Sequence, residues 1–248
     1  MTTIGINTLV YLDALAEGVP QSALLERIAA HGVTLAEVRR EYIRDDAELD
    51  RIAQTAREHG LDLYYSVPER IVTEGELHPD FATFLDEAER MGVRNVKFNQ
   101  GDVKDADTTL IARIDEAAAA HGVTLTIEND QTPENGTLDC TVASLRRIKT
   151  LGGRIGYTFD LGNWYWRGEA PEAAFDQLLP SITVFHLKNV NGAAERERLA
   201  TTMLDEGVID WRPMLRRLDD ATPVFLEYPI AEADVAGQVA VLRDALAA

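Results

Sequence analysis

The chain has 248 residues, of which 46% are hydrophobic and 27% charged, so it has the size and balance of a globular enzyme with one large domain. Its formal net charge of −18 at pH 7 disfavours partners rich in phosphate, so we expect neither nucleic acid nor an anionic membrane as a partner. The single cysteine, Cys140, excludes an intrachain disulfide, and no apolar run reaches the roughly 20 residues of a membrane span, so we expect a cytoplasmic protein.

A helical stretch, a glycine and a short apolar run recur along the first half of the chain. The pattern is found in AAHGVTLAEV (29–38), REHGLDLYYS (57–66), RMGVRNVKF (90–98) and AAHGVTLTIE (119–128). The spacing of about 30 residues is that of one strand plus its crossover helix. The glycines are predicted to take the left-handed conformation that ends a helix; they are Gly32, Gly60, Gly92 and Gly122.

Eight β-prone runs alternate with amphipathic stretches. Strands are predicted at 4–10, 35–40, 61–66, 95–99, 124–128, 155–160, 182–188 and 223–229, and helices at 21–30, 46–58, 79–90, 108–120, 141–149, 170–179, 210–218 and 231–246. This alternation predicts an α/β fold, a closed (β/α)8 TIM barrel, as a single domain over residues 1–248. The alternative, a doubly wound open sheet, lacks its glycine-rich fingerprint after the first strand. The two long connections, 67–80 and 189–207, are expected on the catalytic face, where lids lie.

Each of the last four predicted strands ends on one potential metal ligand. LTIE ends at Glu128, YTFD at Asp160, VFH at His186 and VFLE at Glu227. The strands of a barrel point their carboxyl ends to one face, so the four side chains are expected to converge. Three carboxylates that close repel one another unless a cation lies among them. The pattern therefore predicts a site for a divalent metal, Mn²⁺, Mg²⁺, Co²⁺ or Zn²⁺.

The other histidines are predicted to have structural roles. His31, His59 and His121 each precede a helix-ending glycine, where a cation complements the helix dipole, and His78 lies in a loop. Only His186 ends a strand, which makes it the one candidate imidazole ligand.

Further polar and aromatic residues at or just after strand ends are predicted to contact the substrate. Cationic, amide, hydroxyl and aromatic groups together suit a small polyhydroxylated molecule, a sugar or polyol, with tryptophan stacking on its ring. The candidates for substrate binding are Arg39, Glu41, Tyr65, Lys97, Asn99, Asn163, Trp164 and Trp166. Lys188 follows His186 by two residues and so shares its face of the strand.

The order Glu128, Asp160, His186 and Glu227, with one residue per strand, resembles the xylose-isomerase-like TIM-barrel family of sugar isomerases and epimerases. Further matches are VRREYI after the second strand, TFDLGNW, HLKNV, and DEGVIDW at 205–211, so the resemblance covers essentially the whole chain. It implies a metal-dependent isomerase or epimerase that removes a proton next to a carbonyl and stabilises the enediolate with the metal. Glu128 and Glu227 would then transfer the proton as catalytic residues, and all four residues would bind the metal. Dimers and tetramers are common in this family, so a homo-oligomer stays open.

Two positions differ from the epimerase pattern. Asn163 lies where the epimerases often have histidine, and Lys188 lies where they commonly have glutamate. Lysine in HLKNV resembles the inosose-dehydratase branch, so one alternative is a metal-dependent dehydratase of a keto-polyol, with Lys188 as a catalytic residue. A non-catalytic sugar-binding barrel is a further alternative. The apurinic endonucleases of the family need more strand-end histidines than this sequence has.

Overall fold

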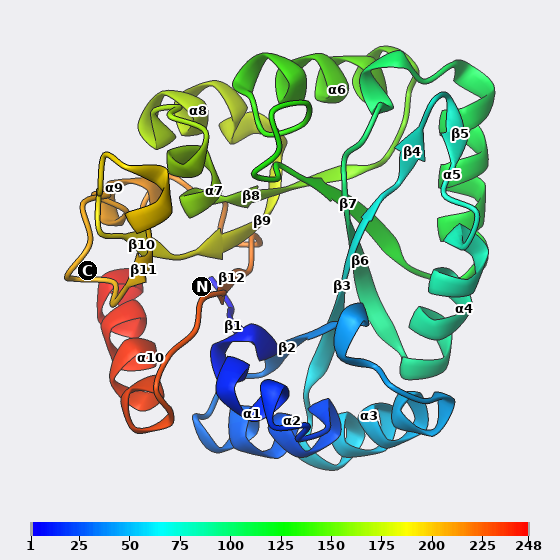
Figure 1. Cartoon of the computed structure of the whole chain (residues 1–248). Coiled ribbons are helices and arrows are strands. Elements are labelled where there is room, and N and C mark those ends of the chain that lie inside the picture. Colours follow the sequence, from blue (N-terminus) through cyan, green and yellow to red (C-terminus); the bar gives the residue numbers. More distant parts are fainter. Residues whose placement is uncertain (1, 248) are drawn as a thin grey trace.

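Eight parallel strands close into a barrel at the centre of the protein (Figure 1). The computed structural model describes residues 2–247. Around the barrel the strand order is β1-β12-β9-β8-β7-β6-β3-β2, and every pairing is parallel. The strands are β1 (Ile4–Asn7), β2 (Leu35–Arg39), β3 (Asp62–Arg70), β6 (Val93–Asn99), β7 (Thr124–Glu128), β8 (Gly156–Asp160), β9 (Ile182–Leu187) and β12 (Val224–Leu226). The prediction of a (β/α)8 barrel is confirmed.

Helices cover the outside of the barrel (Figure 1). The predicted helices correspond to α2 (Gln21–Ala30), α3 (Asp46–His59), α4 (Phe81–Met91), α5 (Thr108–Ala120), α6 (Leu138–Thr150), α8 (Pro171–Leu178), α9 (Arg212–Leu215) and α10 (Glu232–Ala247). Two short helices are added: α7 (Leu161–Trp166) follows β8 directly, and α1 (Leu12–Ala16) follows β1 after the 3-10 turn Thr8–Tyr11. Single 3-10 turns occur at Thr8–Tyr11, Arg40–Tyr42, Val103–Asp105, Leu179–Ser181 and Arg196–Arg198.

Local sequence explains where several helices begin and end. The side chain of Asp45 accepts a hydrogen bond from the backbone N–H of Glu48 at the start of α3, as expected of a helix cap. At the end of the same helix, Gly60 has a φ of 65°, and Gly92 ends α4 with a φ of 74°. Both values lie in the left-handed region, which a residue without Cβ adopts without strain, so the predicted role of the repeated glycines is confirmed.

The two long connections contain ordered hairpins. Strand β3 extends to Arg70, and the hairpin β4 (Val72–Thr73) and β5 (Glu76–Leu77) follows it. In the second connection, β10 (Asn189–Val190) pairs antiparallel with β11 (Thr201–Thr202). Asn189 fixes this connection, because its buried amide donates to the carbonyls of Leu204 and Ile209 at 2.8 and 3.1 Å.

The strand register decides which side chains enter the barrel. Tyr64, Leu35, Val184 and Phe225 form a small apolar cluster of their own, which lies inside the barrel and apart from the main core. Side chains two residues further along a strand point to the same side. Positions such as Glu37 and His186, two residues after Leu35 and Val184, therefore form the next layer, at the carboxyl ends of the strands. This layer is polar and buried.

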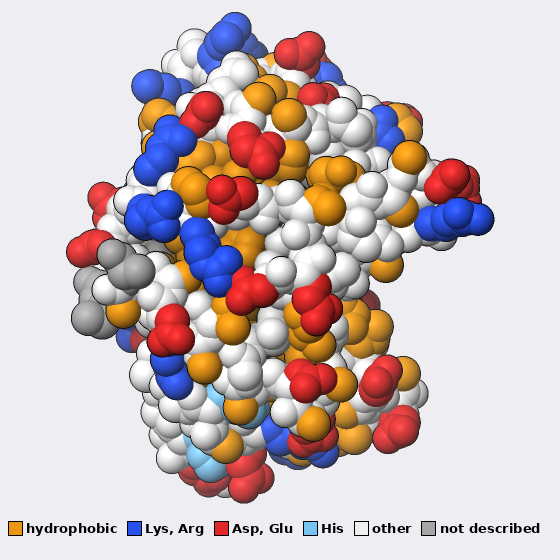
Figure 2. All heavy atoms as spheres, turned by 90° about the vertical axis from the view of Figure 1, so that its left-hand side faces the viewer, with side chains coloured by type: hydrophobic (Ala, Val, Ile, Leu, Met, Phe, Trp, Pro, Cys, Tyr) orange, Lys and Arg blue, Asp and Glu red, His pale blue; other side chains and the backbone are white. Residues whose placement is uncertain are grey.

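The main core lies between the barrel and the helices. Phe159 of β8 stacks on Phe185 of β9, with ring centroids 5.4 Å apart, and contacts Trp164 of α7 at 5.8 Å. Aromatic groups of this size contribute much of the apolar area that a fold buries. None of the described helices is both long and apolar enough to cross a lipid bilayer. On the face seen in Figure 2, acidic and basic side chains lie interspersed among small apolar areas.

Candidate metal centre

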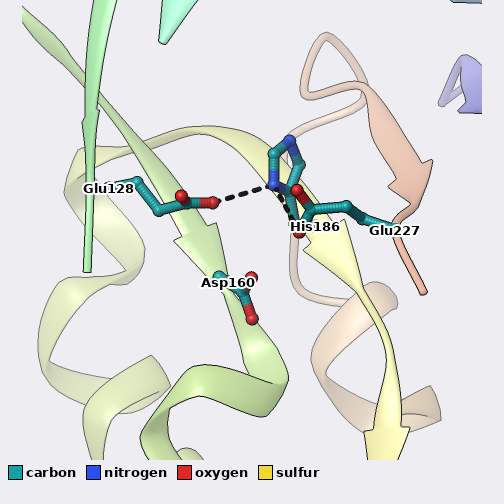
Figure 3. Close-up of side chains that lie close together, drawn as sticks. All are labelled: Glu128, Asp160, His186 and Glu227. Atoms are coloured by element: carbon teal, nitrogen blue, oxygen red, sulfur yellow. Dashed lines mark hydrogen bonds and ion pairs between the residues drawn. The ribbon is translucent and has the colours of Figure 1, made fainter. Parts of the chain in front are cut away.

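Four side chains from consecutive strands of the second half of the barrel converge at its mouth (Figure 3). Glu128 and Asp160 are the last residues of β7 and β8, His186 lies in β9, and Glu227 directly follows β12. One ligand atom from each lies within 4.8 Å of those of the other three, and all four side chains are buried. The predicted convergence is therefore confirmed.

The imidazole of His186 occupies the middle of the cluster. Its Nδ1 lies 2.9 Å from Oε1 of Glu128 and 3.1 Å from Oε2 of Glu227 (Figure 3). Its Nε2 faces the opposite side of the barrel, 3.1 Å from Oε2 of Glu37. Burial lowers the pKa of His186, but the carboxylates of Glu227 and Glu37 outweigh it and hold that pKa well above its usual value.

Cationic side chains neutralise the carboxylates from the sides. Nζ of Lys97 lies 2.6 Å from Oε2 of Glu128. Nζ of Lys188 lies 2.5 Å from Oδ2 of Asp160 and 3.4 Å from Oε2 of Glu227. Buried charges are tolerated only when they are paired in this way or bind a metal.

The pKa values differ among the three carboxylates of the cluster. Burial raises the pKa of Glu227, but His186 and Lys188 outweigh it and hold that pKa well below its usual value. At Asp160 burial dominates and raises the pKa to about 7, although Lys188 acts against it. Two further carboxylates close to Asp160, those of Glu227 and Glu128, add to this rise. Asp160 is thus the carboxylate with the most to gain from an additional positive charge.

The donor set fits a divalent cation. It offers three carboxylates and one imidazole from rigid strand ends, and their atoms are close enough to share one ion. Oxygen-rich ligation with one nitrogen suits Mn²⁺, Mg²⁺, Co²⁺ or Zn²⁺. The cluster is therefore consistent with a divalent-metal site.

A family model described as the xylose isomerase-like TIM barrel matches residues 25–245. The chain belongs to this family.

Solved structures with the same fold agree with this assignment. The IOLI protein, determined with a bound zinc atom, has a TM-score of 0.74 at 16% identity, over 99% of this chain and 98% of that one. D-psicose 3-epimerase, determined in the presence of D-fructose, has a TM-score of 0.72 at 16% identity, over 100% of both chains. The probable 3-DHS dehydratase AsbF of Bacillus anthracis has a TM-score of 0.71 at 16% identity, over 98% of this chain and 99% of that one. At 16% identity these structures show the fold alone. A search of curated proteins found no match in sequence.

Several residues predicted to bind the substrate lie at the candidate metal site of this xylose isomerase-like barrel. Arg39 donates from its guanidinium to Oε1 of Glu227 at 3.0 Å and pairs with Glu41 at 2.7 Å, so it links the cluster to the rim. Lys97 contacts Glu128 directly. Asn163 is buried beside Asp160. The backbone N–H of Asn163 donates to the carboxylate of Asp160 at 3.0 Å, and the side-chain amide of Asn163 donates to the carbonyl of Asn129 at 2.9 Å.

Four other predicted substrate-binding residues have their described contacts away from the four converging side chains. The hydroxyl of Tyr65 donates to Glu87 of α4 at 2.5 Å, on the outside of the barrel. Asn99 donates to the carbonyl of Pro68 at 3.1 Å. Trp164 is completely buried in the core. Trp166 is partly buried and packs against the core. A substrate contact of these four residues stays a prediction.

Two residues of the inner layer were not predicted from the sequence. Glu37 is completely buried on β2, and its carboxylate accepts from the amide of Asn7 at 2.5 Å as well as facing His186. Asn7 also reaches Oε1 of Glu227, at 3.4 Å. A signal was present in the sequence, because Glu37 is a carboxylate in the middle of an apolar strand, LAEVR. Whether the side chain of Glu37 points into the barrel depends on the register of β2 with its neighbouring strands.

Proposed function

We propose that this chain is a divalent-metal-dependent isomerase or epimerase of a sugar or sugar derivative, acting on a proton next to a carbonyl. The placement of Glu128 and Glu227 is the observation that supports this function most. Both carboxylates lie within 3.1 Å of the same atom, Nδ1 of His186. Their strands, β7 and β12, are separated in the barrel by β8 and β9, so the two groups approach the centre from different sides.

This arrangement suits two-sided proton transfer. One carboxylate removes the proton from the reacting carbon and the other returns a proton to it. A base must start in its ionised form, and each of the two is paired with a cation: Glu128 with Lys97, and Glu227 with Arg39 and Lys188. Glu128, Asp160, His186 and Glu227 would hold a divalent cation, which would supply positive charge close to the site of proton removal.

Two structural neighbours support a sugar as the substrate class. D-psicose 3-epimerase was determined with D-fructose present, and L-ribulose 3-epimerase is a further neighbour. The IOLI protein, determined with a bound zinc atom, supports a divalent metal as the cofactor.

Lys188 favours a second candidate, a metal-dependent dehydratase of a keto-polyol. Its ammonium group lies 2.5 Å from Asp160 and is buried within the cluster. A lysine held there can donate a proton to a leaving hydroxyl group, which an epimerase does not require. The probable 3-DHS dehydratase AsbF is a neighbour with this type of activity in its name.

Turnover in deuterated water distinguishes the candidates. The protein is stripped of metal, reloaded with Mn²⁺, Mg²⁺, Co²⁺ or Zn²⁺, and incubated with a panel of ketoses, keto-polyols and keto-acids. Deuterium at one carbon of an isomeric sugar supports the epimerase, whereas a dehydrated product that absorbs ultraviolet light supports the dehydratase. Binding of a sugar without turnover supports a non-catalytic barrel.

Two variants test the proton-transfer pair. Glu128→Gln and Glu227→Gln keep the shape of each side chain and remove its basicity, so each should lower kcat by about 100-fold to 10,000-fold. Glu232→Gln removes an exposed carboxylate of α10 and serves as the control. Full activity in both site variants would contradict the proposed mechanism.

A further inference from the structure

We infer that Glu37 is a positioning residue that holds the ring of His186 through its Nε2 atom, so that Nδ1 faces the bound metal. The inference rests on the proposed metal site and extends it to the opposite side of the barrel. Glu37 lies on β2, whereas the four candidate ligands come from β7, β8, β9 and the end of β12.

The geometry leaves one orientation for the ring. Nδ1 points to the two carboxylates of Glu128 and Glu227, and Nε2 points to Glu37. The carboxylates of Glu128 and Glu227 lie beside Nδ1, and Figure 3 shows Asp160 on the same side of the ring, so a cation shared by all four residues meets the ring at Nδ1. Nε2 then keeps its hydrogen and needs an acceptor, because an unpaired buried N–H is unfavourable.

Glu37 is placed to be that acceptor. Its Oε2 lies 3.1 Å from Nε2, and the side chain is completely buried. Nε2 of His186 and Oε1 of Glu37 both lack an aligned hydrogen bond among the described residues, although the two side chains face each other. A modest rotation of the ring toward a bound ion would complete the bond between them.

Asn7 fixes the carboxylate of Glu37. Its amide nitrogen donates to Oε2 of Glu37 at 2.5 Å, and its amide oxygen accepts from the backbone N–H of Leu9 at 2.8 Å. The second bond sets which end of the amide faces Glu37. The chain Leu9–Asn7–Glu37–His186 therefore transmits the rigid geometry of β1 to the candidate ligand.

The ion pairs around Glu37 support this positioning role. No lysine or arginine pairs with its carboxylate among the described ion pairs, and it is not one of the four converging ligands. The ring of His186 is therefore the one ion-pair partner of Glu37 among the described residues. Carboxylates that accept a hydrogen bond from a metal-bound imidazole fix its orientation and increase metal affinity, typically by 10-fold to 100-fold.

Zinc binding to the metal-stripped protein tests the inference. Isothermal titration calorimetry with Zn²⁺ compares the unaltered chain with Glu37→Gln and Glu37→Leu. The amide of Gln still accepts a hydrogen bond, so Glu37→Gln should weaken binding by about 10-fold and Glu37→Leu by about 100-fold. Glu48→Gln is the matched control, because Glu48 is also a buried carboxylate but lies on α3, bonded to the backbone N–H of Ser22 at 2.8 Å.

The ring of His186 can also be observed directly. In the zinc-loaded unaltered chain, nitrogen NMR should show a protonated Nε2 and a metal-bound Nδ1, and the Nε2 proton should exchange faster with water in Glu37→Gln. This measurement decides the question even if Glu37→Leu does not fold.

The outcomes separate this inference from the proposed function. Binding of Zn²⁺ through Nε2, or unchanged affinity in both Glu37 variants, would overturn the role of Glu37 and leave the metal site intact. Absence of Zn²⁺ binding by the unaltered chain would overturn the metal site itself, and the positioning role with it.

Discussion

Nζ of Lys97 lies 2.6 Å from Oε2 of Glu128, and both side chains are buried inside the barrel. Burial alone raises the pKa of Glu128, but Lys97 outweighs it and holds that pKa below its usual value. Lys97 thus keeps the candidate base Glu128 ionised. It lies on β6, a strand that carries none of the four candidate metal ligands. The pair is specific to the tertiary structure, because 31 residues separate its members.

Replacement of this lysine should affect both stability and activity. Lys97→Met leaves the carboxylate of Glu128 buried without its closest cation, and breaking a buried pair in this way is destabilising by about 3–5 kcal/mol. Urea unfolding of the metal-free protein at pH 8 measures the change. Lys149→Met, an exposed position of α6, is the control. An unchanged free energy of unfolding would mean that Glu128 takes up a proton or another partner when Lys97 is absent.

Gly162 makes room for Lys188. A Cβ atom added at Gly162 would lie 2.6 Å from Cγ of Lys188, closer than two such atoms can approach, so Gly162→Ala should displace the lysine from Asp160. We expect kcat to fall by about 10-fold or more, with Zn²⁺ affinity changed less, since the four ligands themselves stay in place. Gly237→Ala in α10, where an added Cβ meets nothing within 4 Å, is the control. Equal turnover in both variants would argue against a catalytic role of Lys188.

Asp160 should make the metal-free protein less stable at high pH. Burial raises its pKa from 3.8 to about 7 in the folded state, so between these values the folded protein binds more protons than the unfolded chain, and the free energy of unfolding falls as the pH rises. Asp160→Asn removes this effect. It should raise the stability of the metal-free protein at pH 8 by more than about 1 kcal/mol, since a pKa difference of one corresponds to about 1.4 kcal/mol.

The contrast with acidic conditions completes that test. At pH 4 the carboxyl group of Asp160 is protonated in the folded state, so the variant and the unaltered chain should differ little in urea unfolding. Asp13→Asn, at an exposed position of α1, controls for the loss of one surface charge. A variant that is less stable than the unaltered chain at pH 8 would show that the ion pair with Lys188 outweighs the burial of Asp160.

Metal binding should release protons. The carboxylates of Glu227 and Glu37 hold the pKa of His186 well above its usual value despite burial, so Nδ1 carries a proton in the metal-free protein at neutral pH. A cation must displace it, and affinity should rise by about tenfold per pH unit for each proton released. Calorimetry with Zn²⁺ between pH 6 and 8, in buffers of different ionisation enthalpy, measures the number. Affinity independent of pH would place His186 outside the metal's ligands.

As the pH rises, His186 should change the stability of the metal-free protein in the same direction as Asp160. Because its folded pKa lies above its unfolded value of about 6.5, the stabilisation from His186 is complete below that pH and is lost as the pH rises through the folded pKa. Both groups therefore make the metal-free protein less stable in alkaline solution, and a bound cation should reduce this dependence.

The fold and the four converging residues could be predicted from the sequence because their signals are local. An amphipathic stretch, a glycine and an apolar run identify one strand and its helix, and a run that ends at Glu128 or His186 identifies a strand end. In a parallel barrel the direction of all strands is the same, so four strand ends must lie on one face without any knowledge of packing.

The tertiary structure alone decided which of the nearby polar residues face the centre. The sequence favoured Glu41 and Tyr65 because they follow or end predicted strands, but Glu41 lies at the rim beside Arg39, and Tyr65 bonds to Glu87 on the outside of the barrel. Glu37, only four residues before Glu41, is the carboxylate that reaches His186. Neighbouring side chains of a strand point to opposite sides, so the register decides that Tyr64 and not Tyr65 faces the interior, and Glu41 lies beyond the end of β2 in a 3-10 turn. That register is set by hydrogen bonds to neighbouring strands, which are distant in sequence and which no local pattern encodes.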